Sequence, residues 1–145
     1  MSKRKQVYSG PAGEYLVLGE LLRRGHESYL AHGETQKGWD IVMLPNGNEP
    51  IRIQVKAIDW PNELAVNGSF GSGFDILVVV LLNKDGKPKY LIFPQADLEA
   101  IISPHNPERK NNKRTLTISK NYETDTVKRL SQYEDNWGVF GNKNA

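Results

Sequence analysis

The sequence predicts an α/β domain with a central mixed, largely antiparallel sheet flanked by helices. The chain begins with an amphipathic helical segment, continues through short apolar segments separated by turn signals, and returns to helical segments near its end. A length of 145 residues, with 38% hydrophobic and 25% charged residues, fits one domain with its own core. We expect this single domain over residues 10–141, with a basic arm at 1–9 and a frayed tail at 142–145.

The first helix is predicted over Tyr15–Arg24, because Ser9-Gly10-Pro11-Ala12 is typical of a helix start and Gly25 of a helix end. The other elements are predicted from apolar runs that end at glycine, proline or asparagine. We expect strands at 28–31, 39–44, 51–58, 74–82, 90–93 and 115–119, a helix at 95–102 and a terminal helix near 134–137.

The middle of the chain contains a predicted hairpin and a predicted buried strand. The turn Pro45-Asn46-Gly47-Asn48 joins the strands at 39–44 and 51–58, which predicts an antiparallel hairpin. The run at 74–82 is almost continuously apolar, as in a strand buried on both faces. The stretch 61–73 is expected to be irregular, because it contains several glycines and little periodicity.

The composition excludes several classes of function. Cysteine is absent, which excludes disulfide scaffolds, zinc–thiolate sites, iron–sulfur clusters and cysteine nucleophiles. No run approaches the roughly 20 apolar residues of a membrane span, and the basic N-terminus is not followed by an apolar signal core. We therefore expect a cytoplasmic protein without membrane contact, whose catalysis would use carboxylates, lysine, histidine or hydroxyl groups.

Positive charge is concentrated in two segments, although the net charge is only +2. Such segments could contact phosphates, or they could be solvated termini and loops. The residues that we expect to bind nucleic acid are Lys3, Arg4 and Lys5 in the arm and Arg109, Lys110, Lys113 and Arg114 in the loop at 106–114.

Glu14 is a candidate functional residue on the first helix. At 100° per residue it falls in the middle of an apolar stripe that includes Leu18, Leu21 and Leu22. A carboxylate that faces a core is costly unless it is paired, protonated or bound to a cation. The alternative is structural, because the helix dipole stabilises an acid near the helix N-terminus, where it can stay hydrated.

Asp40, Gln54 and Lys56 are predicted to meet on one face of the hairpin. In the strand at 51–58, the period of two sends Gln54 and Lys56 to the face opposite Ile53 and Val55. Asp40 opens the partner strand and can project beside them. A solvated polar face would explain Gln54 and Lys56 alone, whereas convergence with Asp40 and Glu14 would form a metal-assisted phosphodiester site.

The chemistry of such a site follows from its ligands. Glu14, Asp40 and Gln54 offer oxygen atoms only, which favours Mg²⁺, with Mn²⁺ as a substitute. The metal would polarise the phosphoryl oxygen, while Lys56 would activate the attacking water or stabilise developing charge.

These residues resemble the PD-(D/E)XK nuclease superfamily, in which a helix and a hairpin present a helical Glu, an Asp and a (D/E)-x-K. The matching triplets are Gly13-Glu14-Tyr15, Trp39-Asp40-Ile41 and Gln54-Val55-Lys56. Residues 10–58 carry the match, and 10–14 and 21–25 are most similar to archaeal Holliday-junction resolvases and to a homing-endonuclease branch. The resemblance implies a restriction-endonuclease-like core and a Mg²⁺-dependent DNA endonuclease.

Gln54 departs from the usual acid of the third motif. The homing-endonuclease branch is similar in using Gln there, so the resemblance still implies activity, although a neutral amide should weaken metal binding. The alternative is a catalytically inactive domain of the same fold that binds nucleic acid or a protein partner. One site per chain would favour a two-fold homodimer for cutting both strands of a duplex.

Overall fold

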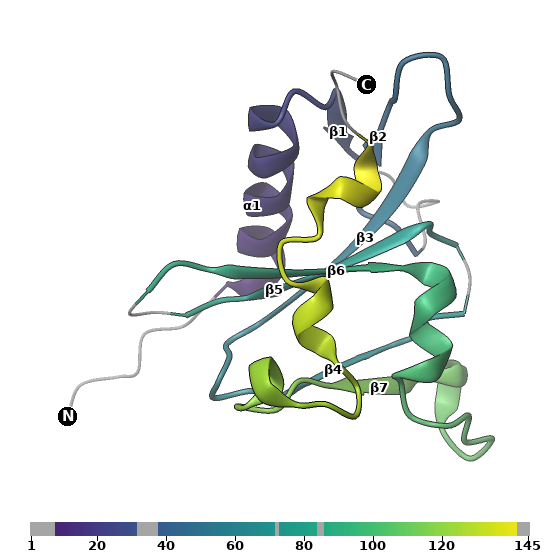
Figure 1. The fold of residues 1–145 in the computed structure, drawn as a ribbon. Helices are drawn as coiled ribbons and strands as arrows, with labels where there is room; N and C mark the ends of the chain where they lie inside the picture. The colour runs from purple at the N-terminus through teal and green to yellow at the C-terminus, as the bar shows by residue number, and fades with distance from the viewer. Residues whose placement is uncertain (1–7, 32–37, 72, 84–85, 142–145) are drawn as a thin grey trace.

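The computed structural model describes residues 8–31, 38–71, 73–83 and 86–141, and Figure 1 shows their arrangement. Five strands form one mixed sheet in the order β1-β2-β3-β5-β6. Their bounds are Ser28–Leu30 (β1), Ile41–Met43 (β2), Ile51–Ile58 (β3), Ile76–Leu81 (β5) and Lys89–Pro94 (β6). β3 and β5 run parallel, and the other neighbours are antiparallel. The predicted mixed, largely antiparallel sheet and the 39–58 hairpin are therefore confirmed.

The helix α1 (Ser9–Arg23) covers one face of this sheet. It begins before the predicted start and ends near Gly25, whose φ of 87° is the left-handed conformation that glycine adopts readily. α1 crosses β3 at Gly13, where a Cβ atom would lie 2.6 Å from the Cβ of Ala57. Glycine at this position therefore allows the helix backbone to approach the strand closely.

The other face of the sheet is covered by a small antiparallel ribbon of β4 (Ala65–Gly68) and β7 (Arg114–Thr117). Figure 1 shows this ribbon below the sheet. Trp60 and Phe70 are buried in the core between them. β5 lies between the two cores with all its residues buried, as the apolar run predicted.

Three expectations were wrong. The stretch 61–73 contains β4, because Val66 pairs with Leu116 of β7 far along the chain. The helix expected at 95–102 is a 3-10 helix, and the terminal helix is replaced by short 3-10 turns, because these segments are too short to stabilise α-helical structure. The 3-10 segments are Gln95–Ala100 (η1), Lys110–Asn112 (η2), Tyr122–Thr124 (η3), Leu130–Tyr133 (η4) and Trp137–Phe140 (η5). Within the described ranges, α1 is the one α-helix.

Parts of the predicted arm, tail and polar loop lie outside the described residues. The basic arm, apart from its last two residues, and the tail at 142–145 lie there, as does most of the polar loop at 33–38. Among the helices that are described, none is long and apolar enough to cross a membrane.

Candidate active site

The candidate site forms where β2 ends its backbone pairing with β3. The amide of Asp40, the residue before β2, donates to the carbonyl of Ile53 at 2.7 Å. The following edge amide of β3, that of Val55, donates instead to the Oδ2 atom of Asp40 at 2.8 Å. The side chain of Asp40 thus continues the ladder, and the register places this carboxylate opposite Gln54. We call the group Asp40, Gln54 and Lys56 the β2–β3 notch.

Gln54 contributes an unsatisfied acceptor to the notch. Its Oε1 atom is buried and accepts no hydrogen bond from the part of the chain that the structure describes. A buried acceptor without a partner costs about 1–3 kcal/mol, so this oxygen is a position that a water or a cation can occupy favourably. A hard cation would supply the missing interaction, and the amide oxygen therefore fits a metal site.

Lys56 is half-buried and is positioned by the ribbon below the sheet. A Cβ atom on Gly68 of β4 would lie 3.4 Å from the Cε of Lys56 and 3.3 Å from the ring of Phe70. The lysine stem therefore passes over the backbone of Gly68 and beside an aromatic ring. This packing restricts the side chain, since long lysine stems lose rotamer freedom when they are covered.

Glu14 lies beside the apolar face of α1 rather than within it, which corrects the expected stripe. The buried line of the helix is Gly13, Val17 and Leu21, whereas Leu22 is 51% exposed. At 100° per residue this line is centred about 60° from Glu14. Because the expected stripe weighted large apolar residues, it missed that the small Gly13 sets the contact with β3.

The structure places Asp40 beside the segment of β3 that carries Gln54 and Lys56, whereas Glu14 lies on α1, which packs on the other face of that strand. Glu14 is half-buried and follows Gly13, which packs on Val55 and Ala57. Gln54 and Lys56 project from the opposite face of the same strand, because they alternate with those two residues.

The predicted metal ligands are all oxygen atoms, and two of the ligand groups are negatively charged. Within the described ranges, no three side chains of histidine, aspartate or glutamate gather into a metal-binding group. The predicted ligand set offers the carboxylates of Asp40 and Glu14 and the amide oxygen of Gln54. Such oxygen donors fit Mg²⁺ or Mn²⁺ better than the softer transition metals.

The basic loop divides into two kinds of residue. The guanidinium of Arg114 forms two hydrogen bonds of 2.8 Å with Glu99 and a third with the carbonyl of Ser103. Hydrogen bonding to Arg114 lowers the pKa of Glu99, and the same bond raises the pKa of Arg114. Arg109 donates to the hydroxyl of Thr115 at 3.0 Å. Both arginines therefore stabilise the loop through hydrogen bonds to neighbouring residues.

Lys110 and Lys113 are exposed, and neither is paired with a carboxylate among the residues that the structure describes. Lys3, Arg4 and Lys5 lie outside the described residues.

The sequence analysis missed Gly68, because it missed the strand that contains it. The alternation of Leu64 and Val66 with less apolar residues was the available signal, and it was too short to indicate a strand.

The fold is a five-stranded mixed sheet with α1 on one face, and Asp40 lies beside the Q-x-K segment of β3. No protein-family model matches the chain, and no curated protein matches it. A solved bacterial homing endonuclease, I-Ssp6803I, is similar with a TM-score of 0.64 and 13% identity, over 91% of this chain and 90% of that chain. This likeness shows a shared fold, and the predicted α/β class with a central mixed sheet is confirmed.

A second solved structure is Hjc, a Holliday junction resolvase from Archaeoglobus fulgidus. It has a TM-score of 0.45 and 21% identity, over 74% of this chain and 83% of that chain.

Proposed function

We propose that the chain is a metal-dependent endonuclease that hydrolyses phosphodiester bonds in DNA, of a resolvase-like or homing-endonuclease-like kind. The observation that carries this proposal is the β2–β3 notch. Asp40 is fixed there by the amide of Val55, the buried Oε1 of Gln54 has no partner among the described residues, and Lys56 extends from the same face. The nuclease-like fold supports the same proposal, because a homing endonuclease shares it.

Each residue of the notch has a distinct role. The Oδ1 atom of Asp40 would bind the cation, because Oδ2 is held by Val55. Gln54 would add its Oε1 atom, and Glu14 would bind directly or through a water. A bound Mg²⁺, or Mn²⁺ in its place, would polarise the phosphoryl oxygen and favour attack by water. The ammonium of Lys56 would orient that water or stabilise charge on the phosphate.

The basic residues proposed to contact nucleic acid fall into two groups, exposed lysines and hydrogen-bonded arginines. Lys110 and Lys113 are free to meet phosphates, and the basic arm of Lys3, Arg4 and Lys5 is proposed to do the same. Arg109 and Arg114 support the loop instead of binding phosphate directly, because their guanidinium groups already hold Thr115 and Glu99.

A cytoplasmic location and a homodimer stay predictions. On plasmid DNA, a monomer should first release nicked circles, whereas a dimer with two sites should release linear DNA.

The test is cleavage of duplex, single-stranded and branched DNA with Mg²⁺, Mn²⁺ or EDTA. Asp40→Asn is the sharpest variant, because an amide oxygen still accepts from Val55 while the negative charge is removed. We expect Asp40→Asn and Lys56→Ala each to reduce the single-turnover cleavage rate about 10²- to 10³-fold. Both variants should retain DNA binding measured in EDTA.

The alternative is a catalytically inactive domain that binds nucleic acid or a protein partner. The observation that favours it is the neutral Gln54 at a position where the motif usually has an acid. Metal-dependent cleavage that disappears in Lys56→Ala would exclude this alternative. DNA binding without cleavage of any substrate, in all three metal conditions, would support it instead.

A further inference from the structure

The loop at 105–113 is held in one conformation by hydrogen bonds at both ends. The hydroxyl of Ser69 donates to the carbonyl of Asn111 at 2.8 Å, and this contact ties the loop to the residue after β4. The side chain of Asn106 accepts from the amide of Glu108 at 2.9 Å, and Nε2 of His105 lies 3.3 Å from Oδ1 of Asn112. A polar surface loop with this many fixed contacts is preorganised for binding.

Asn111 and Asn112 form the tip of this loop in an unusual conformation. Their φ angles are 61° and 54°, in the left-handed region that costs most residues about 1–2 kcal/mol. Both residues are exposed. Asparagine is one of the few residues besides glycine that adopts this conformation readily, so both positions combine a left-handed backbone with an exposed amide side chain. Amides are groups that form paired hydrogen bonds with base edges, especially those of adenine.

The loop tip is hydrogen-bonded to the segment that follows β4, next to the glycine that contacts Lys56. Gly68, which supports Lys56, directly precedes Ser69, and Ser69 bonds to Asn111. A surface pocket of about 340 Å³ opens between these segments, and its lining residues are Ser69, Gly71, His105, Asn112 and Arg114. A DNA strand that enters this pocket would contact Asn112 directly.

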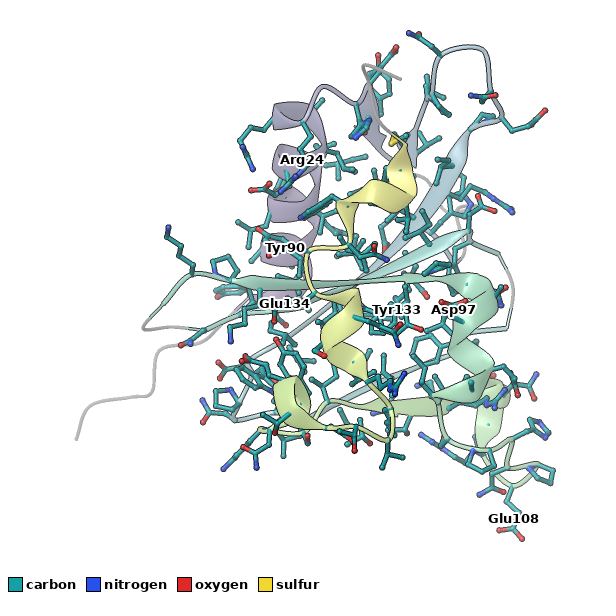
Figure 2. All side chains as sticks on the ribbon, in the orientation of Figure 1. Arg24, Tyr90, Asp97, Glu108, Tyr133 and Glu134 are labelled. Carbon is teal, nitrogen blue, oxygen red and sulfur yellow. The ribbon has the colours of Figure 1, made fainter. Side chains whose placement is uncertain are left out.

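The charge around the tip is complementary to DNA. Lys110 and Lys113 flank the two asparagines and are exposed. Figure 2 shows Glu108, the acid of the loop, at the outer end of the molecule. Two cations therefore flank two amides, an arrangement in which the cations can hold phosphates while the amides face the bases.

We propose that the loop at 105–113 is the specificity-determining element, in which Asn111 and Asn112 contact base edges of a DNA duplex whose phosphates Lys110 and Lys113 hold. This inference rests on the proposed function for its substrate, and it adds that the protein distinguishes DNA sequences next to the cleavage point.

The test is selection of bound duplexes from a random library in EDTA, so that the result is independent of cleavage. Asn111→Gly with Asn112→Gly keeps the left-handed backbone and removes both amides. We expect this double variant to lose discrimination at one or two base pairs, by about 5- to 150-fold, with little change in the salt dependence of binding. Circular dichroism confirms that the variant is folded.

The matched comparison removes charge instead. Lys110→Gln with Lys113→Gln should weaken binding to all sequences and reduce the slope of log K against log salt by about 2. Lys87→Gln with Lys120→Gln removes two exposed charges away from the loop and should change neither quantity.

Three results would overturn the inference. These are a wild-type protein without sequence preference, a glycine variant that selects the wild-type sequence, and equal weakening by the two lysine pairs. Preserved selection by a wild-type protein that cuts nothing with Mg²⁺ would overturn the proposed activity while supporting this inference.

Discussion

Asp40 has two separable functions at the site, one structural and one electrostatic. Its carboxylate satisfies the amide of Val55 at the point where the ladder between β2 and β3 ends. Removing the side chain leaves that amide without its partner. We therefore expect Asp40→Ala to lower the free energy of unfolding by about 1–3 kcal/mol, and Asp40→Asn to leave it within about 0.5 kcal/mol of wild type. Urea unfolding measures both. Equal stability of the two variants would contradict the structural role.

The period of two in β3 predicted the shared face of Gln54 and Lys56 correctly, because side-chain direction in a strand is a local property. The hydrogen bond from Val55 to Asp40 could not be predicted, since it depends on where β2 turns away from β3. The unsatisfied oxygen of Gln54 is likewise a tertiary property. The local pattern therefore predicted the shared face of Gln54 and Lys56, whereas the hydrogen-bond partners depend on the tertiary fold.

At the scale of elements, the close crossing of α1 and β3 depends on Gly13. Alanine there would place its Cβ 2.6 Å from the Cβ of Ala57, so the helix would have to shift. We expect Gly13→Ala to be less stable than Gly19→Ala by about 1–3 kcal/mol, measured by urea unfolding. Gly19 is the matched control, because it is also helical and a Cβ there would meet no atom within 4 Å.

The rescue variant separates crowding from other effects of Gly13→Ala. Adding Ala57→Gly should restore room at the crossing and recover part of the lost stability. Because Glu14 follows Gly13, the single variant should also weaken cleavage. Full stability of Gly13→Ala would contradict the crossing as described.

The elements that the sequence failed to predict are those defined by distant partners. β4 is four residues long and depends on pairing with β7, so its own residues carry a weak pattern. The stripe of α1 was placed too near Glu14, because helix periodicity cannot indicate which face the sheet contacts. In contrast, β3 and β5 have strong local patterns and were predicted closely.

At the scale of the whole molecule, buried tyrosines link stability to alkaline pH. Tyr122 donates to the carboxylate of Glu134, and Tyr133 donates to Asp97 at 3.1 Å, a pair that Figure 2 labels. Burial is the largest cause that raises the pKa of Tyr122, and the bond to Glu134 adds to it. The unfolded chain therefore loses this proton at lower pH than the folded protein does.

Stability from Tyr122 should be fully present below about pH 10, the usual pKa of tyrosine, and should fall as the pH rises further. We expect a loss of about 1.4 kcal/mol per pH unit for this group. Tyr122→Phe should be less stable at pH 8 and should show a shallower decline between pH 10 and 11 in urea unfolding. An unchanged slope in the variant would contradict the raised pKa.

The central claim is that the β2–β3 notch binds a divalent metal and uses it to cut DNA. The most direct measurement is the Mg²⁺ concentration that gives half-maximal cleavage for the wild type and for Gln54→Glu. A third carboxylate near the notch should lower this concentration about tenfold, because the charge of the ligands sets the affinity for hard cations. Equal Mg²⁺ dependence in the two proteins, or cleavage by both in EDTA, would contradict the account.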